Sequence, residues 1–229
     1  MDLIDALRTT GAVRDFTPEG VPDEVLARIL DTARFAPSGG NRQAWRVVVV
    51  KGGETRRRLR DLYLEGWHPY LAMTAAGLTP WAPLNDREAE ARAVAGAPPP
   101  AEPGSPAGGG FAERLDEVPV LLVVLADLRH LAAVDRDLGR YTLAGGASVY
   151  PFAWNLLLAA RAEGLGGVMT TMPILREPEV KAVLDAPDDL AVATVMALGH
   201  PVRQPRRLTR APVERWATVD RVGGAPFGG

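Results

Sequence analysis

The apolar positions in the first third of the chain recur mainly at helical spacing. A narrow apolar stripe predicts a short helix over residues 2–8. A second helix is predicted to begin at Pro22, where acidic residues favour its positive end. It must end near Ala36, because Pro37 disfavours helical geometry in the residue before it. Residues 54–65 carry a third helical pattern, which is basic.

Four apolar runs predict β-strands, and they are separated by helical patterns. They are WRVVVVK (45–51), PVLLVVLAD (119–127), GGVMTTM (166–172) and LAVATVMALGHP (190–201). The first run is apolar on both faces, which predicts a central strand. Residues 143–163 are apolar nearly all round and predict one long core or interface helix, and residues 176–184 predict a short one. Buried strands interleaved with helices indicate an α/β or α+β sandwich.

The stretch from about 66 to 110 has no clean period. It carries Trp67, Tyr70 and Trp81 and closes with a Pro/Gly tract, APPPAEPGSPAGGG. We expect its aromatic part to form a lid over a pocket and its Pro/Gly part to be a flexible tether. Apart from this insertion, we expect a single domain over 1–229, with a C-terminal tail at about 202–229 that is basic and then extended.

Composition narrows the function classes. The 229 residues are 47% hydrophobic and 24% charged, enough for a core that folds without staples. With no cysteine there is no disulfide framework, thiolate zinc site or cysteine nucleophile, and we expect no metal site. A net charge of −2 gives no case for nucleic-acid or membrane binding. The N-terminus lacks the order of a signal peptide, so a cytoplasmic protein is expected. Neither GxGxxG nor GxxxxGK[ST] occurs at a strand–helix turn, which argues against Rossmann and P-loop folds.

The most specific local motif is APSGGNRQAW, residues 36–45, between a helix and a strand. Its glycines expose backbone amides, and Asn41 and Gln43 add donors and acceptors at alternate positions. Such a loop can hydrogen-bond a planar, heteroatom-rich ring such as the pyrimidine edge of a flavin. Taken alone, it is more often a polar connector in which Ser38 and Asn41 satisfy backbone groups.

Three further features have two interpretations each. Arg14, close to Phe16, can reach a phosphate or the electron-rich end of a flavin, although a surface ion pair is commoner. GLGGVMTTMP, residues 164–173, lets a ligand approach the backbone or is simply a tight turn. A basic cluster after the last strand suits a phosphate group or is a solvated tail; it comprises Arg203, Arg206, Arg207 and Arg210.

Together, and in this order, these features resemble the FMN-dependent nitroreductases. The resemblance rests on APSGGNRQAW, on ASVYPFAWNLLLAARAEGLGG with its continuation VMTTMP, and on ALGHP. It spans essentially the whole chain except residues 66–110. It implies an α+β, nitroreductase-like fold with a central, mostly antiparallel sheet flanked by helices. It also implies an intertwined homodimer with FMN sites at the subunit interface and a C-terminal tail that embraces the partner.

The resemblance also assigns binding roles by position. Arg14 matches the basic residue near the N1–C2 carbonyl end of the ring, where a fixed cation stabilises negative charge. Arg207 matches the C-terminal arginine that grips the phosphate. The positions that match the lining of the ring are Pro37, Ser38, Gly39, Asn41, Gln43, Gly166, Gly167, Met172 and Pro173.

One departure concerns the phosphate. The family usually has an arginine and a serine just before the basic residue, where this chain has Thr10, Gly11 and Ala12. Thr10 and backbone amides remain as possible ligands. We therefore expect weaker FMN binding than is typical, or compensation by Arg8 or Arg206, and a rise in bound flavin when arginine is restored at Gly11.

The resemblance further implies an activity. No side chain need act as general acid, base or nucleophile, because the cofactor carries the redox chemistry at its N5 position. NADH or NADPH would reduce the enzyme in a ping-pong cycle, with a deazaflavin donor also open, and a nitroaromatic, quinone or similar small molecule would accept the electrons. Trp67, Tyr70 or Trp81 would wall the shared slot. The alternatives are an FMN-dependent dehydrogenase or oxidase of a biosynthetic pathway, and a flavin-binding protein without turnover.

Overall fold

The computed structural model describes residues 2–99 and 110–228. Its helices are α1 (Leu3–Thr9), α2 (Asp23–Ala33), α3 (Gly53–Ala75), α4 (Arg87–Ala95), α5 (Tyr150–Ala162) and α6 (Glu177–Leu184). Its strands are β1 (Trp45–Val49), β2 (Val120–Asp127), β3 (Gly166–Thr170) and β4 (Leu190–Gly199). Short 3-10 turns lie at Gly39–Asn41, Leu115–Glu117, Ala144–Ser148, Met172–Arg176 and Val213–Arg215.

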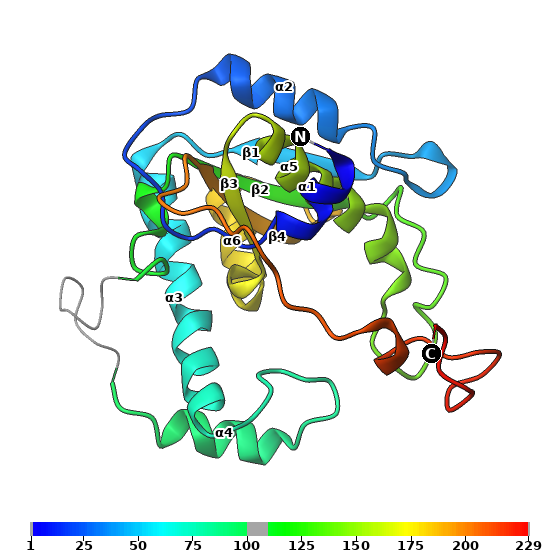
Figure 1. The fold of residues 1–229 in the computed structure, drawn as a ribbon. Coiled ribbons are helices and arrows are strands. Elements are labelled where there is room, and N and C mark those ends of the chain that lie inside the picture. The colour runs from blue at the N-terminus through cyan, green and yellow to red at the C-terminus, as the bar shows by residue number, and fades with distance from the viewer. Residues whose placement is uncertain (1, 100–109, 229) are drawn as a thin grey trace.

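The four strands form one antiparallel sheet in the order β1-β2-β4-β3, with helices on both faces (Figure 1). Alternate residues of β2 point to opposite faces, so Leu122 and Val124 pack in one core and Leu121 and Val123 in another. The first core lies under α2 and α5, and the second lies under α3 and α6. The expected α+β fold with an antiparallel sheet flanked by helices is confirmed.

The prediction that the run at 45–51 is a central strand is wrong. Strand β1 pairs only with β2 and is an edge strand. Its apolar composition has another cause, because helices cover both faces of the sheet even at this edge. Val47 and Val49 pack against the first core and Val48 against the second. A strand that is apolar on both faces is therefore one whose two faces are both covered, and it need not be central in the strand order of the sheet.

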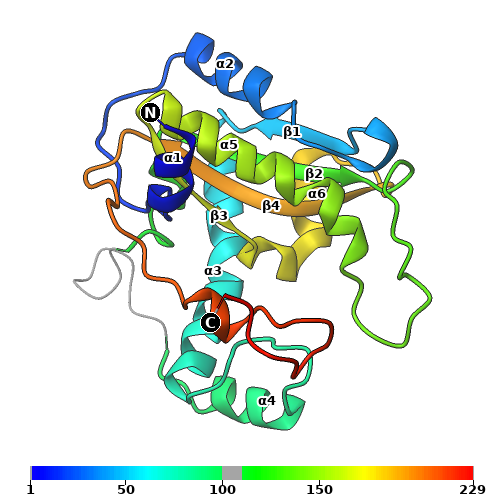
Figure 2. The ribbon, with the colours of Figure 1, turned by 45° about the vertical axis from the view of Figure 1, so that its right-hand side comes forward.

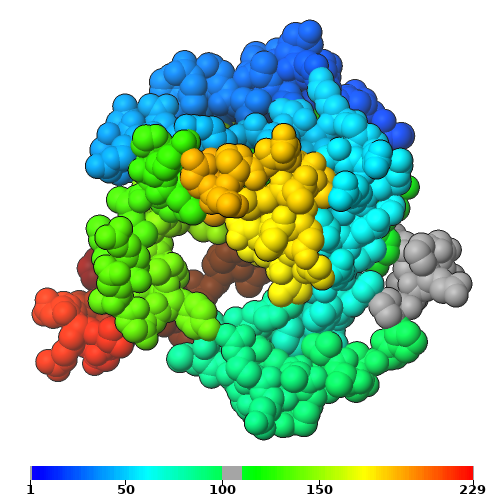
Figure 3. Space-filling view, turned by 180° about the vertical axis from the view of Figure 1, so that it is seen from behind, coloured from blue at the N-terminus to red at the C-terminus, as the bar shows by residue number. Residues whose placement is uncertain are grey.

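Helix α3 is longer than the predicted 54–65, because it continues through Pro69 to Ala75. It extends away from the sheet and carries α4, so the two form an arm (Figure 2). The rings of Trp67 and Tyr70 stack along it at 5.2 Å. Figure 3 shows an opening between this arm and the rest of the molecule. The Pro/Gly tract predicted to be a tether falls largely outside the described residues.

The predicted helix over 143–163 is also corrected. Its first part, Ala144–Ser148, is a 3-10 turn, and the α-helix begins at Tyr150. The buried carboxylate of Asp135 accepts hydrogen bonds from the amides of Leu143 and Ala144 and so fixes the entry to this turn. Among the described residues, no helix has the length and apolar character needed to cross a membrane.

Candidate flavin site

The segment that carries Thr10 and Arg14 is joined to the far edge of the sheet by backbone hydrogen bonds. The amide of Val13 donates to Gly167 O at 2.9 Å, next to a parallel bridge between Ala12 and Gly167. Further along, the amide of Thr17 donates to His200 O at 2.8 Å. The N-terminal segment, β3 and the start of the C-terminal tail therefore lie side by side.

A basic cavity of about 740 Å³ opens between α1, α5 and this tail. We call it the arginine cavity; it is lined by Asp5, Leu7, Arg8, Thr9, Thr10, Trp154, Arg206, Arg207, Leu208 and Arg210. Within residues 2–99 and 110–228, no carboxylate lies within ion-pair distance of Arg8, Arg206 or Arg207. Thr10 is buried, and its hydroxyl has no hydrogen-bond partner in this part of the chain. Unpaired guanidinium groups beside a buried free hydroxyl fit a phosphate group.

Gly11 explains how the tail reaches this cavity. A Cβ atom at position 11 would lie 2.8 Å from Leu208 Cδ2 and 3.3 Å from Pro205 Cγ. The missing side chain therefore lets the tail pack directly on the N-terminal segment, which places Arg206 and Arg207 beside Thr10. The absence of a side chain at position 11 and the close approach of the tail therefore go together.

Arg14 faces a different, smaller cavity of about 340 Å³, together with Phe16, Phe111, Arg114 and Glu117. Its charge also acts on Tyr63 of α3. Burial raises the pKa of Tyr63, whereas a hydrogen bond from Thr170 and the charge of Arg14 oppose the rise. Arg14 is thus a cation at the mouth of an aromatic-lined hollow, next to the end of β3.

Gly166 and Gly167 are buried, and the structure gives a packing reason for both. A Cβ atom at Gly166 would lie 2.7 Å from Val13 Cγ2, and one at Gly167 would lie 2.4 Å from Leu198 Cδ2. Protein atoms therefore fill the space that these glycines leave. Met172 and Pro173 follow in a 3-10 turn that packs against α3 at Gly66. The ring-lining roles of these four residues stay a prediction.

The loop at 37–43 is held in an unusual conformation. Asn41 and Gln43 have φ angles of 52° and 50°, in the left-handed region that L-residues adopt only when their surroundings hold them there. Ser38 Oγ accepts from the amide of Gln43 at 3.0 Å, and the amide of Gly39 donates to Ser148 Oγ at 3.0 Å. The side chains of Asn41 and Gln43 stay exposed and hydrogen-bond each other at 3.2 Å.

Apart from Met172 and Pro173, which lie against α3, the structure places the predicted residues in two groups. Thr10, Gly166, Gly167 and Arg207 gather around the tail, with Arg14 on the next stretch of the same segment. The 37–43 loop lines neither cavity and lies beyond the other end of the sheet, away from α1, in both ribbon views (Figures 1 and 2). Within a single chain, the two groups do not form one site.

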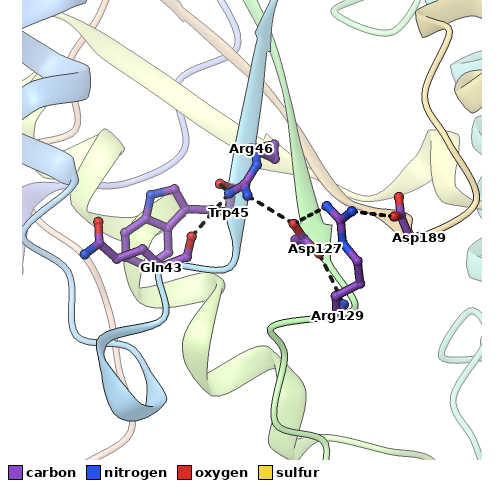
Figure 4. Close-up of polar contacts among 6 residues, drawn as sticks. All are labelled: Gln43, Trp45, Arg46, Asp127, Arg129 and Asp189. Carbon is purple, nitrogen blue, oxygen red and sulfur yellow. Dashed lines mark hydrogen bonds and ion pairs between the residues drawn. The ribbon is translucent and has the colours of Figure 1, made fainter.

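Sequence reasoning missed a polar cluster beside this loop. Arg46 of β1 donates from Nη2 to Asp127 Oδ2 at 3.0 Å, and Asp127 also binds Arg129 (Figure 4). The signals were present, because an arginine inside an apolar run and an aspartate at the end of a buried strand are both unusual. Only their spatial proximity shows that they belong together.

Helices on both faces of an antiparallel sheet, with a cavity rich in arginine at its edge, define an α+β protein. Comparison with known proteins makes this specific. The sequence model of the Nitroreductase family matches residues 7–200, so this chain belongs to that family and is an oxidoreductase.

Individual relatives agree with this assignment. The chain is 32% identical over 206 residues to an NADH dehydrogenase of Thermus thermophilus, covering 89% of each chain. It is 30% identical over 205 residues to a 5,6-dimethylbenzimidazole synthase of Rhodospirillum rubrum, covering 86% of this chain and 82% of the relative. The fold matches a crystal structure of an oxidised iodotyrosine deiodinase bound to FMN and 3-iodo-L-tyrosine. That match has a TM-score of 0.64 and 23% identity, and covers 93% of this chain and 96% of the other.

Proposed function

We propose that this chain is an FMN-dependent oxidoreductase that uses NADH or NADPH to reduce nitroaromatic, quinone or similar acceptors. The observation that carries the proposal is the arginine cavity at the edge of a nitroreductase fold, beside a buried Thr10 hydroxyl that has no hydrogen-bond partner among the described residues. FMN, when bound, supplies the hydride and electron chemistry. The similarity to an NADH dehydrogenase supports a nicotinamide donor.

The residues of the chain would bind, orient and shield the cofactor. Arg207 and Arg206 would hold the phosphate through paired N–H donors, with Thr10 as a further donor. Arg14 would place a positive charge near the ring, and Asn41 and Gln43 would hydrogen-bond its edge. Their exposed amides are free to do so, apart from the bond between the two side chains.

The aromatic arm would wall the acceptor slot. Trp67 and Tyr70 stack with an interplanar angle of 11°, and Trp81 lies 6.3 Å from Tyr70 between ring centroids. Such a set of flat faces favours planar, aromatic acceptors over aliphatic ones. This arrangement supports the expectation that the aromatic part of the insertion at about 66–110 forms a lid.

We further propose that the working unit is a homodimer in which each site takes residues from both chains. The separation of the 37–43 loop from the arginine cavity supports this arrangement. Exposed apolar side chains support it as well: Leu3 of α1 is 65% exposed, and Trp216 and Phe227 of the tail are 69% and 62% exposed. A partner chain packed on α1 and the tail would bury these side chains.

The cofactor is tested by titrating FMN and riboflavin into the purified, flavin-free protein. Arg207→Ala should weaken FMN by about 10-fold or more, the value of a charge-assisted hydrogen bond, and leave riboflavin unchanged because riboflavin has no phosphate. Arg58→Ala, at an exposed arginine of α3, is the matched control and should change neither. Equal losses for both ligands would contradict the assigned role of the cavity, and a wild-type chain that binds no FMN would contradict the function itself.

The shared site is tested by subunit complementation. Arg207→Glu and Gln43→Glu chains would each bind FMN poorly, but a mixed dimer would contain one site with neither change. Co-refolded mixtures should therefore recover bound flavin on the mixed species. Recovery of none, with mixed dimers present, would place each site within one chain.

A second candidate is an FMN-dependent enzyme of a biosynthetic pathway, which the similarity to a 5,6-dimethylbenzimidazole synthase supports. Anaerobic addition of NADH and then NADPH separates the two candidates. Rapid loss of the oxidised-flavin absorption, followed by its return on adding a quinone, is expected from the first. A bound flavin that neither nicotinamide reduces would favour the second.

A further inference from the structure

A buried carboxylate lies at the end of β2, close to the predicted ring-binding loop. The side chain of Asp127 is 0% exposed, and its oxygens accept from Arg46 Nη2 at 3.0 Å and from Arg129 Nε at 2.9 Å and Nη2 at 2.8 Å. A buried carboxylate needs such partners, because nothing else replaces its lost hydration. The hydrogen bonds from Arg129 hold the pKa of Asp127 down to about 2, so the carboxylate stays ionised near neutral pH.

Arg46 links the Asp127 carboxylate to the backbone at the end of the loop. Its second nitrogen, Nη1, donates to Trp45 O at 2.8 Å and makes a longer contact of 3.5 Å with Gln43 O (Figure 4). The amide of Asp127 donates to Ala44 O at 2.8 Å. Three successive carbonyls, at residues 43, 44 and 45, are thus bound by Asp127 or by the arginine that Asp127 holds.

These contacts lie where the loop most needs support. Gln43 has a φ angle of 50°, and Asn41, two residues earlier, has one of 52°. Inside the loop, Ser38 Oγ accepts from the amide of Gln43, and the exposed Arg42 donates from Nη1 to Gly39 O at 3.1 Å. A planar guanidinium bound on one side to a buried charge is a stiffer support than an exposed side chain alone.

We propose that Asp127 is a positioning residue, which acts through Arg46 to hold Gln43 and Asn41 in the left-handed conformation in which the loop meets the flavin ring. The statement about the ring rests on the proposed function. Arg129 binds the same carboxylate but turns the other way, to Asp189 at 2.8 Å. It supports the turn before β4 and, within residues 2–99 and 110–228, makes no hydrogen bond to the loop, which makes it a matched control.

The test compares Arg46→Met with Arg129→Met, since each removes one arginine from Asp127. Hydrogen exchange of flavin-free protein should show faster exchange of the Asn41 and Gln43 amides in Arg46→Met, with Arg129→Met like the wild type. FMN should bind about 10-fold more weakly to Arg46→Met and within about 2-fold of wild type to Arg129→Met. Arg46→Lys keeps a cation for Asp127 and should fold normally. Its single nitrogen cannot bind both Asp127 and the loop carbonyls, so we expect amide exchange and FMN affinity between those of the wild type and Arg46→Met.

Equal effects of the two methionine variants on exchange and on FMN would overturn the proposal, because they would show general destabilisation only. Unchanged amide exchange in Arg46→Met would overturn it as well. If the wild-type chain binds no FMN, the proposed function fails by itself, and the exchange rates still decide whether Arg46, which Asp127 binds, holds the loop.

Discussion

Replacing Gly66 with alanine sets two opposing effects against each other at the root of the arm. Gly66 lies in the interior of α3, where alanine is favoured over glycine by about 1 kcal/mol. A Cβ atom there, however, would lie 2.7 Å from the backbone oxygen of Met172. Overpacking of this kind costs about 1–3 kcal/mol, and the upper end applies because a backbone carbonyl cannot rotate away as a side chain can.

We expect Gly66→Ala to destabilise the protein by about 1–2 kcal/mol, since the steric cost exceeds the gain in helix propensity. For a chain of this length, that corresponds to a fall in Tm of about 2–8 °C. Urea unfolding followed by circular dichroism measures the free energy of unfolding, provided that the m-value stays constant.

Gly53→Ala is the control, because it makes the same exchange in the same helix. Its nearest atom, Arg57 Nη1, lies 3.4 Å away at the end of a flexible side chain, so stability should be unchanged or slightly higher. A Gly66→Ala protein about 1 kcal/mol more stable than the wild type would refute the reasoning, since propensity alone would then decide.

Three further outcomes follow from the packing and the charges. The Leu143 amide and Arg140 lower the pKa of Asp135 to about 2, so its ionised carboxylate stabilises the fold fully above about pH 4 and loses this effect as the pH falls towards 2. Urea unfolding from pH 5 to pH 2 should therefore show a steeper fall in the free energy of unfolding for the wild type than for Asp135→Asn. Parallel curves for the two proteins would contradict this role of Asp135. Phe152→Ala removes a buried ring that stacks on Trp45 at 4.7 Å between ring centroids and should lower the free energy of unfolding by about 3–5 kcal/mol. A loss under about 1 kcal/mol in urea unfolding would contradict this packing. Gly11→Arg pushes Leu208 and the tail outward and should weaken FMN binding in a calorimetric titration. This is the reverse of the gain that the resemblance to the family suggests. Tighter FMN binding would contradict the packing of the tail on Gly11.

The chain sequence identified every strand and most helices, because periodicity and breaker residues act locally. The run at 119–127 became β2, buried at every position, and the pattern at 22–36 became α2. The extension of α3 past Pro69 was not recoverable in this way, since an irregular run of aromatic residues hides a helix whose contacts are with its own arm.

The same distinction between local and tertiary information applies to the candidate site. The types of residue that suit a flavin, in the 37–43 loop, at Arg14 and at Arg207, can be recognised from motif order alone, and the residues stay predictions as ligands. Their grouping could not be recognised, since the structure places the loop and the arginine cavity apart from each other, with no residue of the loop lining the cavity. Asp127 carries no motif at all, and its role depends entirely on what lies next to it.

The sequence by itself determined the family and the layered arrangement of strands and helices, because local patterns and short motifs carry that information. Only the tertiary structure decided that β1 is an edge strand and that Gly11 is the space into which the tail packs. It also brought the buried carboxylate of Asp127 into contact with Arg46, beside the loop. These are contacts between residues distant in the chain, and the free energy of such contacts depends on atoms that no local pattern contains.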